Sequence, residues 1–195
     1  MHVFLGITGA SGAPYASLLL RRLADADCEV GICISRSGYE VLGTELYGDP
    51  SLPRDEIASR FTEGTEARIY AENDWKAPYA SGSAKVDAYV VCPCSMSTVG
   101  TLAAGAMANV IHRAASVALK EERKLVLVPR ETPLSLIHLQ GLTTLRQAGA
   151  TILFAAPGFY HGWSSVDDLI EFVVERALDH IGLDREGVRR WGQVT

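Results

Sequence analysis

The sequence predicts a single three-layer α/β domain of the Rossmann-like kind, with a mainly parallel central sheet. Short apolar runs alternate with longer runs of helical periodicity along the chain, which is the element order of parallel α/β proteins. The short runs are continuously apolar rather than alternating, as expected for strands covered by helices on both faces. With 195 residues and a hydrophobic content of 48%, the chain can build one substantial core.

The first elements follow a strand–helix–strand–helix order. A strand is predicted over Val3–Ile7 and a helix over Ala13–Ala24, with Pro14 in the first turn, where no backbone N–H is needed. A second strand over Glu29–Ser35 precedes a helix that includes Tyr39–Leu46.

The middle of the chain is predicted to be richer in loops. Gly48–Pro53 is a loop by its glycine and proline content, and Arg68–Tyr70 is a short strand. Asn73–Ser83 is a polar loop with two aromatic residues, long enough to have a functional role. Ala88–Cys92 is the next strand, and Pro93 is expected to end it.

The last part of the chain alternates again. Ser95–Gly105 and Val110–Glu121 are predicted helices that are separated near Asn109. The remaining elements are a strand at Leu125–Val128, a helix at Leu134–Ala148, a strand at Thr151–Phe154 and an amphipathic helix at Val166–Ile181. Residues 183–195 are expected to form a C-terminal tail of the same domain.

The loops that follow the strands predict where a ligand binds. In sheets of this kind the ligand lies beyond the carboxyl ends of the strands. Each of these loops carries small, hydroxyl, charged or aromatic residues, which together predict one composite site. The loops are Thr8–Gly12, Ser35–Gly38, Pro93–Thr98, Pro129–Pro133 and Ala155–His161.

The first of these loops, in the stretch GITGASGAPYA at Gly6–Ala16, is predicted to bind an anion. A strand, a glycine-rich turn and a helix start place unpaired backbone N–H groups and the positive end of a helix dipole together. The glycine spacing is not G-x-G-x-x-G, and the second strand ends in Ser35-Arg36-Ser37 instead of the acidic residue that binds a dinucleotide ribose. A mononucleotide such as FMN therefore fits better than NAD or FAD.

A second helix start, Ser95–Thr98, is also rich in hydroxyl groups. A plain helix cap and a ligand site are both compatible with such residues. Its place beyond another strand favours ligand binding next to the first loop.

Composition argues against several other classes of protein. A formal net charge of −5 does not favour nucleic-acid binding, and no apolar stretch approaches the roughly 20 residues of a membrane span. The first residues enter a strand without the features of a signal peptide, so we expect a cytoplasmic protein. Gly9–Ala13 lacks the final glycine of a G-x-S-x-G nucleophile elbow.

The four cysteines do not predict a metal site. Cys28, Cys33, Cys92 and Cys94 form no C-x-x-C pair and no zinc-ligand spacing. We expect reduced thiols that pack near strand ends, and no bound metal.

A group of charged and phenolic side chains is the last candidate for chemistry. Arg130 and Glu131 directly follow a buried strand, and Tyr160 follows the last strand in the same way. Lys120 and Arg176 lie on predicted helices, and the pattern alone would make each of them a solvated surface residue.

Several motifs together resemble the UbiX family of flavin prenyltransferases, formerly described as 3-polyprenyl-4-hydroxybenzoate or aromatic-acid decarboxylases. The resemblance extends from residue 3 to residue 192, and GITGASGA and VPRETP are its most specific parts. The sequence departs from the family pattern at Ser97, at His112-Arg113 and in the Gly48–Pro53 loop. The remaining motifs are the Trp75 and Ser81-Gly82-Ser83 loop, VVCPCSMST, LKEERKLVLVPRETPLSLIHL, APGFYH and the closing RW.

The resemblance implies a flavoprotein fold and an enzyme that needs no metal. Such enzymes join a dimethylallyl group from dimethylallyl phosphate to N5 and C6 of reduced FMN. The prenylated FMN then serves a UbiD-type decarboxylase, and the family commonly forms a dodecamer with sites at subunit interfaces. FMN is therefore expected as a substrate.

The resemblance also implies roles for individual residues. Ser11, Glu45 and Glu131 would manage protons, and Trp75 and Trp191 would line the prenyl pocket. The residues expected to hold dimethylallyl phosphate are Lys120, Glu131, Tyr160 and Arg176, with Lys120 also stabilising the departing phosphate. The residues expected to hold FMN are Gly9, Ala10, Ser11, Ser35, Ser95, Met96, Ser97, Thr98 and Arg130.

Two other functions remain open at this point: a flavin enzyme that decarboxylates an acid directly, and a flavin carrier without catalytic activity. A magnesium-dependent prenyltransferase is not favoured. The acidic run at Asp167–Glu171 is a single cluster, and it is expected in the first turn of a helix, where the dipole stabilises it.

Overall fold

A six-stranded parallel sheet organises the protein. The computed structural model describes residues 1–159 and 162–183, and its strands lie in the order β3-β2-β1-β4-β5-β6 with every pair parallel. This order is that of doubly wound, Rossmann-like folds, so the predicted fold class is confirmed. The strands are β1 (His2–Ile7), β2 (Glu29–Ile34), β3 (Arg68–Tyr70), β4 (Ala88–Cys94), β5 (Lys124–Pro129) and β6 (Thr151–Ile152).

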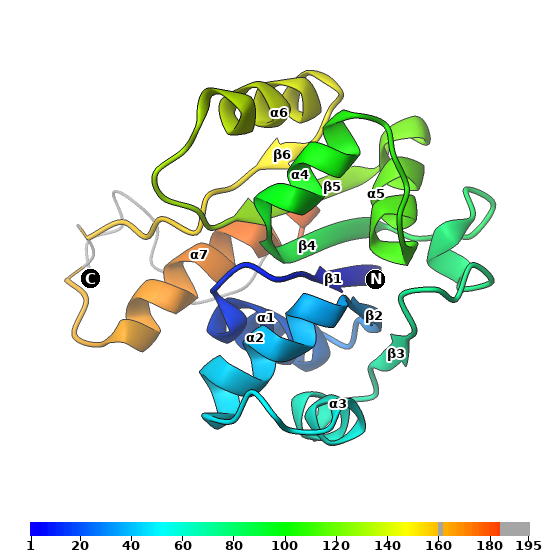
Figure 1. Ribbon diagram of the computed structural model, residues 1–195. Helices are drawn as coiled ribbons and strands as arrows, with labels where there is room; N and C mark the ends of the chain where they lie inside the picture. Colours follow the sequence, from blue (N-terminus) through cyan, green and yellow to red (C-terminus); the bar gives the residue numbers. More distant parts are fainter. Residues whose placement is uncertain (160–161, 184–195) are drawn as a thin grey trace.

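Helices cover both faces of the sheet and complete the three layers. In Figure 1, α4, α5 and α6 lie above the sheet and α1, α2 and α3 lie below it, while α7 packs against α1 and β5. A short 3₁₀ helix, η1, covers Pro78–Ala80. The α-helices are α1 (Ala13–Asp25), α2 (Arg36–Tyr47), α3 (Arg54–Thr62), α4 (Met96–Ala103), α5 (Val110–Lys120), α6 (Leu136–Gln147) and α7 (Val166–Ile181).

Alternate side chains of the strands enter two separate cores. Val3, Leu5 and Ile7 of β1 pack in the core shared with α1 and α7, whereas Phe4 packs in the core shared with α5. All residues of β4 are buried. The continuous apolar runs of the sequence therefore reflect burial on both faces, as predicted.

The thiols are packed as expected. Cys33, Cys92 and Cys94 are buried, Cys28 is half-buried, and all four are free.

One helix and two strand boundaries differ from the prediction. The helix α3 was not predicted, although Ile57 and Phe61 are buried one helical turn apart on it. Pro93 does not end β4, because its carbonyl accepts hydrogen bonds from the neighbouring loop at Thr8 and the strand continues to Cys94. The strand β6 is short, although the backbone beyond it still bonds to β5 as far as Ala155.

Candidate functional site

The loops after β1 and β4 meet at the point where the strand order reverses. The chain leaves β1 towards β2 on one side, and β4 pairs with β1 on the other, which is where doubly wound sheets bind ligands. The buried Thr8 joins the two loops: its Oγ1 donates to the Pro93 carbonyl at 2.9 Å and accepts from the Ser95 backbone N–H at 2.7 Å. The predicted composite site therefore has a hydrogen-bonded centre.

The loop after β2 packs against the same centre. The backbone N–H of Ser35 donates to the Ile7 carbonyl at 2.9 Å, and the Ser35 side chain caps α2 by accepting from Gly38 N at 3.0 Å. A Cβ atom at Gly9 would collide with the side chain of Ser37. Gly9 is thus required because the backbone of the first loop lies directly on the start of α2.

The start of α4 carries two kinds of hydroxyl group: those that cap the helix and one that is exposed. Ser95 caps the helix by accepting from Thr98 N at 3.3 Å, and the two hydroxyl groups lie 3.1 Å apart. Met96 and Thr98 are buried, whereas Ser97 is exposed. Ser97 therefore presents the accessible hydroxyl of this turn.

Helix α2 has the same arrangement as α4. Ser35 caps it and Ser37, its second residue, is exposed. Two helix starts with exposed hydroxyl groups therefore lie at one end of the sheet, and the N-termini of helices attract anions.

The N-terminus of α1 is used differently from the prediction. The Glu45 carboxylate, on α2, accepts hydrogen bonds from Gly12 N at 2.8 Å and Ala13 N at 2.7 Å. These are the N–H groups that the sequence offered to a phosphate. The starts of α2 and α4 are consequently the better places for the phosphate group of a ligand, and Glu45 lies beside the loop that contains Ser11.

The loop after β5 completes this end of the sheet. Arg130 Nε donates to the Ser11 carbonyl at 3.1 Å, which fixes the guanidinium next to the first loop. The neighbouring Glu131 is exposed and accepts from Thr132 N at 3.1 Å. An exposed carboxylate and a fixed cation therefore lie at the same end of the sheet.

Tyr15 is a member of this site that the sequence analysis did not single out. Its ring lies against the Gly12 backbone, and burial raises the pKa of its hydroxyl, with the Arg130 charge acting in the opposite direction. Tyr15 therefore remains a neutral donor at neutral pH. The only sequence signal was its place three residues after the glycine that precedes α1.

Lys120 lies at the opposite end of the sheet. It is the last residue of α5, four residues before β5 begins at Lys124, whereas Arg130 directly follows β5. The six residues of β5 separate the two ends by roughly 20 Å. One copy of the chain therefore does not bring Lys120 to Ser11, Arg130 and Glu131.

Arg176 also lies away from the loop cluster. It is in the second half of α7, whose last carbonyl, that of Ile181, accepts from Lys124 Nζ at 2.8 Å where β5 begins. The exposed Arg176 guanidinium pairs with Asp179 at 2.9 Å.

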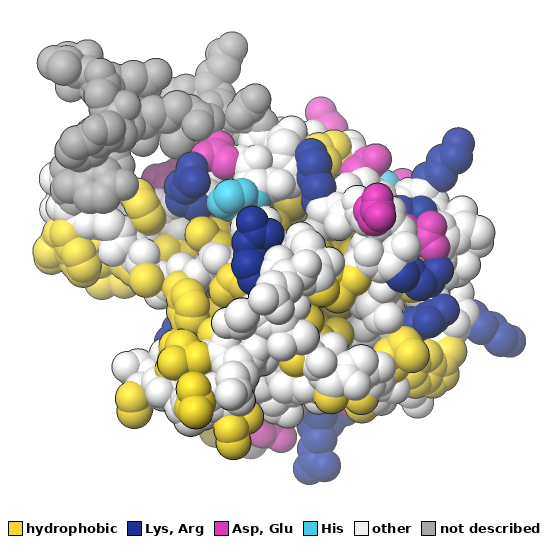
Figure 2. Space-filling model, turned by 90° about the horizontal axis from the view of Figure 1, so that it is seen from above, with side chains coloured by type: hydrophobic (Ala, Val, Ile, Leu, Met, Phe, Trp, Pro, Cys, Tyr) yellow, Lys and Arg dark blue, Asp and Glu magenta, His cyan; other side chains and the backbone are white. Residues whose placement is uncertain are grey.

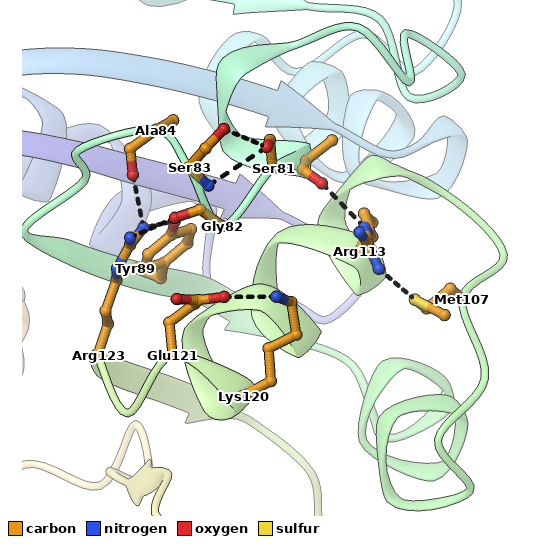
Figure 3. Close-up of polar contacts among 11 residues, drawn as sticks. Ser81, Gly82, Ser83, Ala84, Tyr89, Met107, Arg113, Lys120, Glu121 and Arg123 are labelled. Carbon is orange, nitrogen blue, oxygen red and sulfur yellow. Dashed lines mark hydrogen bonds and ion pairs between the residues drawn. The ribbon is translucent and has the colours of Figure 1, made fainter.

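Lys120 has polar neighbours in the Ser81-Gly82-Ser83 motif, which the sequence analysis named but did not place next to it. Its ammonium forms an ion pair with Glu121, and the turn Ser81–Ser83 lies beside this pair (Figure 3). The Ser81 and Ser83 hydroxyl oxygens are 2.8 Å apart. This region forms a second polar cluster, at the end of the sheet where the strands begin.

The remaining predicted residues are one exposed tryptophan and two positions outside the described part. Trp75 is exposed, three residues after Glu72, whose carboxylate accepts from Arg36 N at 3.3 Å. Tyr160 and Trp191 lie outside the described residues.

Two further searches concern the described residues only. Within residues 1–159 and 162–183, no group of three or more His, Cys, Asp or Glu side chains could hold a metal ion. In the same part of the chain, every helix is too short or too polar to cross a bilayer.

Known proteins share both the sequence and the fold. A family model named Flavoprotein matches residues 1–178. Flavin prenyltransferase UbiX of Pseudomonas aeruginosa is 46% identical over 98% of this chain and 94% of its own length.

The chain belongs to the UbiX family of flavin prenyltransferases.

Solved structures of UbiX proteins have the same fold. The crystal structure of AnUbiX in complex with FMN and dimethylallyl pyrophosphate is 34% identical, with a TM-score of 0.88, and the match covers 100% of this chain and 98% of that one. The dodecameric FMN-dependent UbiX-like decarboxylase from Escherichia coli O157:H7 is 36% identical, with a TM-score of 0.87 and coverage of 99% and 100%. The resemblance drawn from the motifs is thereby confirmed.

The end of the sheet where the loops meet in this UbiX-family chain carries groups that suit the phosphate of a mononucleotide. The exposed hydroxyl groups of Ser37 and Ser97 lie at two helix starts, where a phosphate is favoured. The missing side chain at Gly9 lets the first loop pack directly against Ser37 at the start of α2. Arg130 is fixed on that loop by its hydrogen bond to the Ser11 carbonyl, so a positive charge lies at this end of the sheet.

Proposed function

We propose that this protein is a flavin prenyltransferase, which joins the dimethylallyl group of dimethylallyl phosphate to N5 and C6 of reduced FMN. The observation that carries the proposal is the convergence of four loops, after β1, β2, β4 and β5, in a UbiX-family chain. Hydrogen bonds of Thr8 and Arg130 join the loops after β1, β4 and β5, and the Ser35 N–H joins the loop after β2 to the end of β1. Reduced FMN, when bound, supplies the nucleophilic positions that accept the prenyl group.

The loop cluster is proposed as the flavin site. The exposed Ser37 and Ser97 mark the helix starts at which the phosphate of FMN is best accommodated. Met96 and Thr98 are buried, so they contribute through the backbone and through packing. With Ser37 added to the residues that the resemblance implies, the proposed set is Gly9, Ala10, Ser11, Ser35, Ser37, Ser95, Met96, Ser97, Thr98 and Arg130.

Proton transfer is assigned to residues of the same end of the sheet. Glu45 and Glu131 are carboxylates that can accept protons released by the reaction, and the Ser11 hydroxyl lies in the loop between them. Two N–H donors, at Gly12 and Ala13, hold Glu45 in a fixed position, and pre-positioned acid–base groups are the more effective ones.

The leaving phosphate requires positive charge, and the candidate cations of this chain lie away from the loop cluster. Lys120, Arg176 and the Tyr160 hydroxyl are proposed to stabilise the phosphate through charge-assisted hydrogen bonds as the allylic C–O bond breaks. The electron pair leaves with the phosphate, and the faces of Trp75 and Trp191 can stabilise the allylic cation by ~1–2 kcal/mol each.

Because Lys120 and Arg176 lie far from Ser11, we propose that one active site takes residues from more than one copy. A dodecameric relative supports self-assembly. Exposed apolar side chains also support it, since Leu136 and Ile137 at the start of α6 are 70% and 77% exposed. Hydrophobic side chains gather on the face seen from the α4–α6 side (Figure 2), as is common for surfaces covered by a partner.

The wider role follows from the product. We propose that the whole chain acts as one flavin-binding domain in the cytoplasm, without a metal, as part of a dodecamer. Its prenylated FMN is proposed to pass to a UbiD-type decarboxylase, which uses it as a cofactor.

The direct test measures the mass of the flavin. Purified protein is incubated with reduced FMN and either dimethylallyl phosphate or dimethylallyl pyrophosphate, and the flavin is extracted for mass spectrometry. A flavin that gains one prenyl group supports the proposal, and the better prenyl donor of the two identifies the substrate. Unmodified FMN in both reactions would contradict it.

A direct decarboxylase is the second candidate, because the solved relative from Escherichia coli carries that word in its name. This function predicts release of CO₂ from an aromatic acid with FMN alone and no change in flavin mass. The variant Glu131→Gln distinguishes an enzyme from a flavin carrier without catalytic activity. Flavin binding should stay intact in both cases, whereas product formation should be lost if the protein is an enzyme.

A further inference from the structure

The turn that carries Ser81 and Ser83 is held in place by an arginine from another part of the chain. Arg123 Nη2 donates to the Gly82 carbonyl at 2.6 Å, and its Nη1 donates to the Ala84 carbonyl at 2.8 Å (Figure 3). One planar guanidinium thus bridges two carbonyls on both sides of Ser83. An arginine fork fixes such a geometry better than a single ammonium group.

The other contacts of Arg123 make this fork rigid. Its Nη1 also donates to the Tyr89 hydroxyl at 3.2 Å, and Tyr89 is fully buried on β4. Its backbone N–H donates to the Ala118 carbonyl at 2.8 Å, just beyond the end of α5. The turn is therefore connected through Arg123 to both the sheet and the helix that ends at Lys120.

The Ser81–Ala84 turn, in turn, limits the positions that the Lys120 ammonium can adopt. A Cβ atom added at Gly82 would lie 2.9 Å from Lys120 Nζ and would collide with the Glu121 carboxylate. The ammonium thus lies beside the Gly82 backbone and pairs with Glu121, while about half of the Lys120 side chain remains exposed. The space left for the ammonium on this side depends on the position of the 81–84 backbone.

We infer that Arg123 is a positioning residue, which fixes the Ser81–Ala84 turn and through it places the Lys120 ammonium for the allylic phosphate. The inference rests on the proposed function only for the identity of the phosphate. It assigns a role to a residue that touches neither the flavin loops nor the reacting atoms, and it explains why glycine stands at position 82.

The test compares Arg123→Gln and Arg123→Lys with Lys124→Gln. Lys124 is the matched control: it is the next residue, it is also cationic, and its Nζ donates to the Ile181 carbonyl instead of the turn. Arg123→Gln should raise KM for dimethylallyl phosphate about tenfold, the equivalent of ~1.4 kcal/mol, and Lys124→Gln less than about twofold. Arg123→Lys should restore part of the loss, since one ammonium replaces some of the contacts.

Two further readouts separate positioning from a general loss of stability. The affinity for FMN should stay unchanged in Arg123→Gln, and amide hydrogen exchange in residues 80–86 should become faster only in the Arg123 variants. Gly82→Ala is a second probe, because its methyl group meets only the flexible ends of Lys120 and Glu121. It should raise the same KM with an unchanged melting temperature.

Several results would overturn the inference. These are unchanged exchange in Arg123→Gln, a KM that does not rise, or a parallel loss of affinity for both substrates. If the wild-type protein forms no prenylated flavin, the proposed function fails, and binding of inorganic phosphate then replaces KM. In that case weaker phosphate binding by Arg123→Gln than by Lys124→Gln supports the positioning role, and equal or absent binding contradicts it.

Discussion

At the scale of single residues, Glu45 changes the use of a whole helix end. The glycine-rich loop before α1 offers two backbone N–H groups, and the Glu45 carboxylate accepts both of them. A carboxylate at a helix N-terminus stabilises the helix through hydrogen bonds and through the dipole. Glu45 is thus a helix cap from a distant element as well as a candidate proton acceptor.

Glu45→Gln should therefore destabilise the protein as well as impair catalysis. Loss of the charge weakens two hydrogen bonds and the dipole interaction, so the free energy of unfolding should fall by ~1–2 kcal/mol in urea titrations. Glu40→Gln is the control, because Glu40 lies on the same helix and its carboxylate forms an exposed ion pair with Arg36 at 3.8 Å. Equal stabilities of the two variants would contradict the capping role.

The Cys33 thiol makes the free energy of unfolding depend on pH in the alkaline range. Burial raises the pKa of its thiol from 9.0 to about 12, and the charges of Glu72 and Asp74 add to the shift. The unfolded thiol ionises first, so this contribution to stability is complete below pH 9 and is lost as pH rises towards 12. The free energy of unfolding of Cys33→Ala should fall less steeply over this range, by up to ~1.36 kcal/mol per pH unit.

The slope of the free energy of unfolding against pH separates the ionisation of the Cys33 thiol from the cavity that the substitution leaves. Removing the sulfur atom lowers stability by the same amount at every pH, whereas the ionisation acts only above pH 9. Urea titrations at pH 8, 9, 10 and 11 give the comparison. Parallel curves for Cys33→Ala and the wild type would show that this thiol does not titrate in the way its burial implies.

At the scale of elements, the helix starts combine capping with ligand binding. Ser95 and Ser35 use their side chains as caps, and the exposed Ser97 and Ser37 follow two residues later. A cap is occupied by its own helix, so the exposed second serine is the better ligand. One short motif thus serves stability and function with different residues.

Alanine variants of α4 should separate these two uses. Ser95→Ala removes the cap and should lower the free energy of unfolding by ~1 kcal/mol. Ser97→Ala removes only an exposed hydroxyl and should change stability by less than ~0.5 kcal/mol, while it weakens FMN binding. Urea titration and flavin fluorescence titration measure the two effects, and a Ser97→Ala variant with unchanged FMN affinity would remove Ser97 from the flavin site.

The missed helix α3 also belongs to this scale. Its signals are local: Pro53 before the first turn, the acidic residues Asp55 and Glu56 in that turn, and Ile57 and Phe61 four residues apart. This pattern is typical of a short helix with a narrow buried face. It could have been predicted, because none of its features depends on the rest of the fold.

At the scale of the whole molecule, one chain divides the proposed catalytic residues between two ends of the sheet. Ser11, Arg130 and Glu131 lie where the strands end, and Lys120 lies where β5 begins. A site that needs all of them must combine copies.

Mixed oligomers should reveal this sharing. Lys120→Ala and Glu131→Gln are each expected to be inactive, but a site that takes Glu131 from one copy and Lys120 from another is intact when the two variants meet. Random assembly of equal amounts should restore about a quarter of wild-type activity. The variants are co-expressed with different tags and purified through both, and a mixed oligomer without activity would place the two residues in the same copy.

The sequence by itself determined the layers of the fold and the loops that form the candidate site. Buried parallel strands are continuously apolar, and all of their carboxyl ends point the same way, so Thr8–Gly12, Ser35–Gly38 and Pro93–Thr98 had to meet. The most specific motifs of the family resemblance, GITGASGA and VPRETP, lie at the loops after β1 and β5. The individual roles assigned through it remain predictions for the experiments above.

Only the tertiary structure decided which side chains occupy those places. The packing of α2 on α1 delivers Glu45 to Gly12, and the bend after α5 delivers Arg123 to the Gly82 carbonyl. Neither contact can be predicted from a local sequence pattern, because its two partners are more than 30 residues apart in the sequence. Hydrophobic periodicity indicates only which face of one helix or strand is buried. The distance between Lys120 and Arg130 has the same origin: both adjoin β5, and the length of that strand keeps them apart.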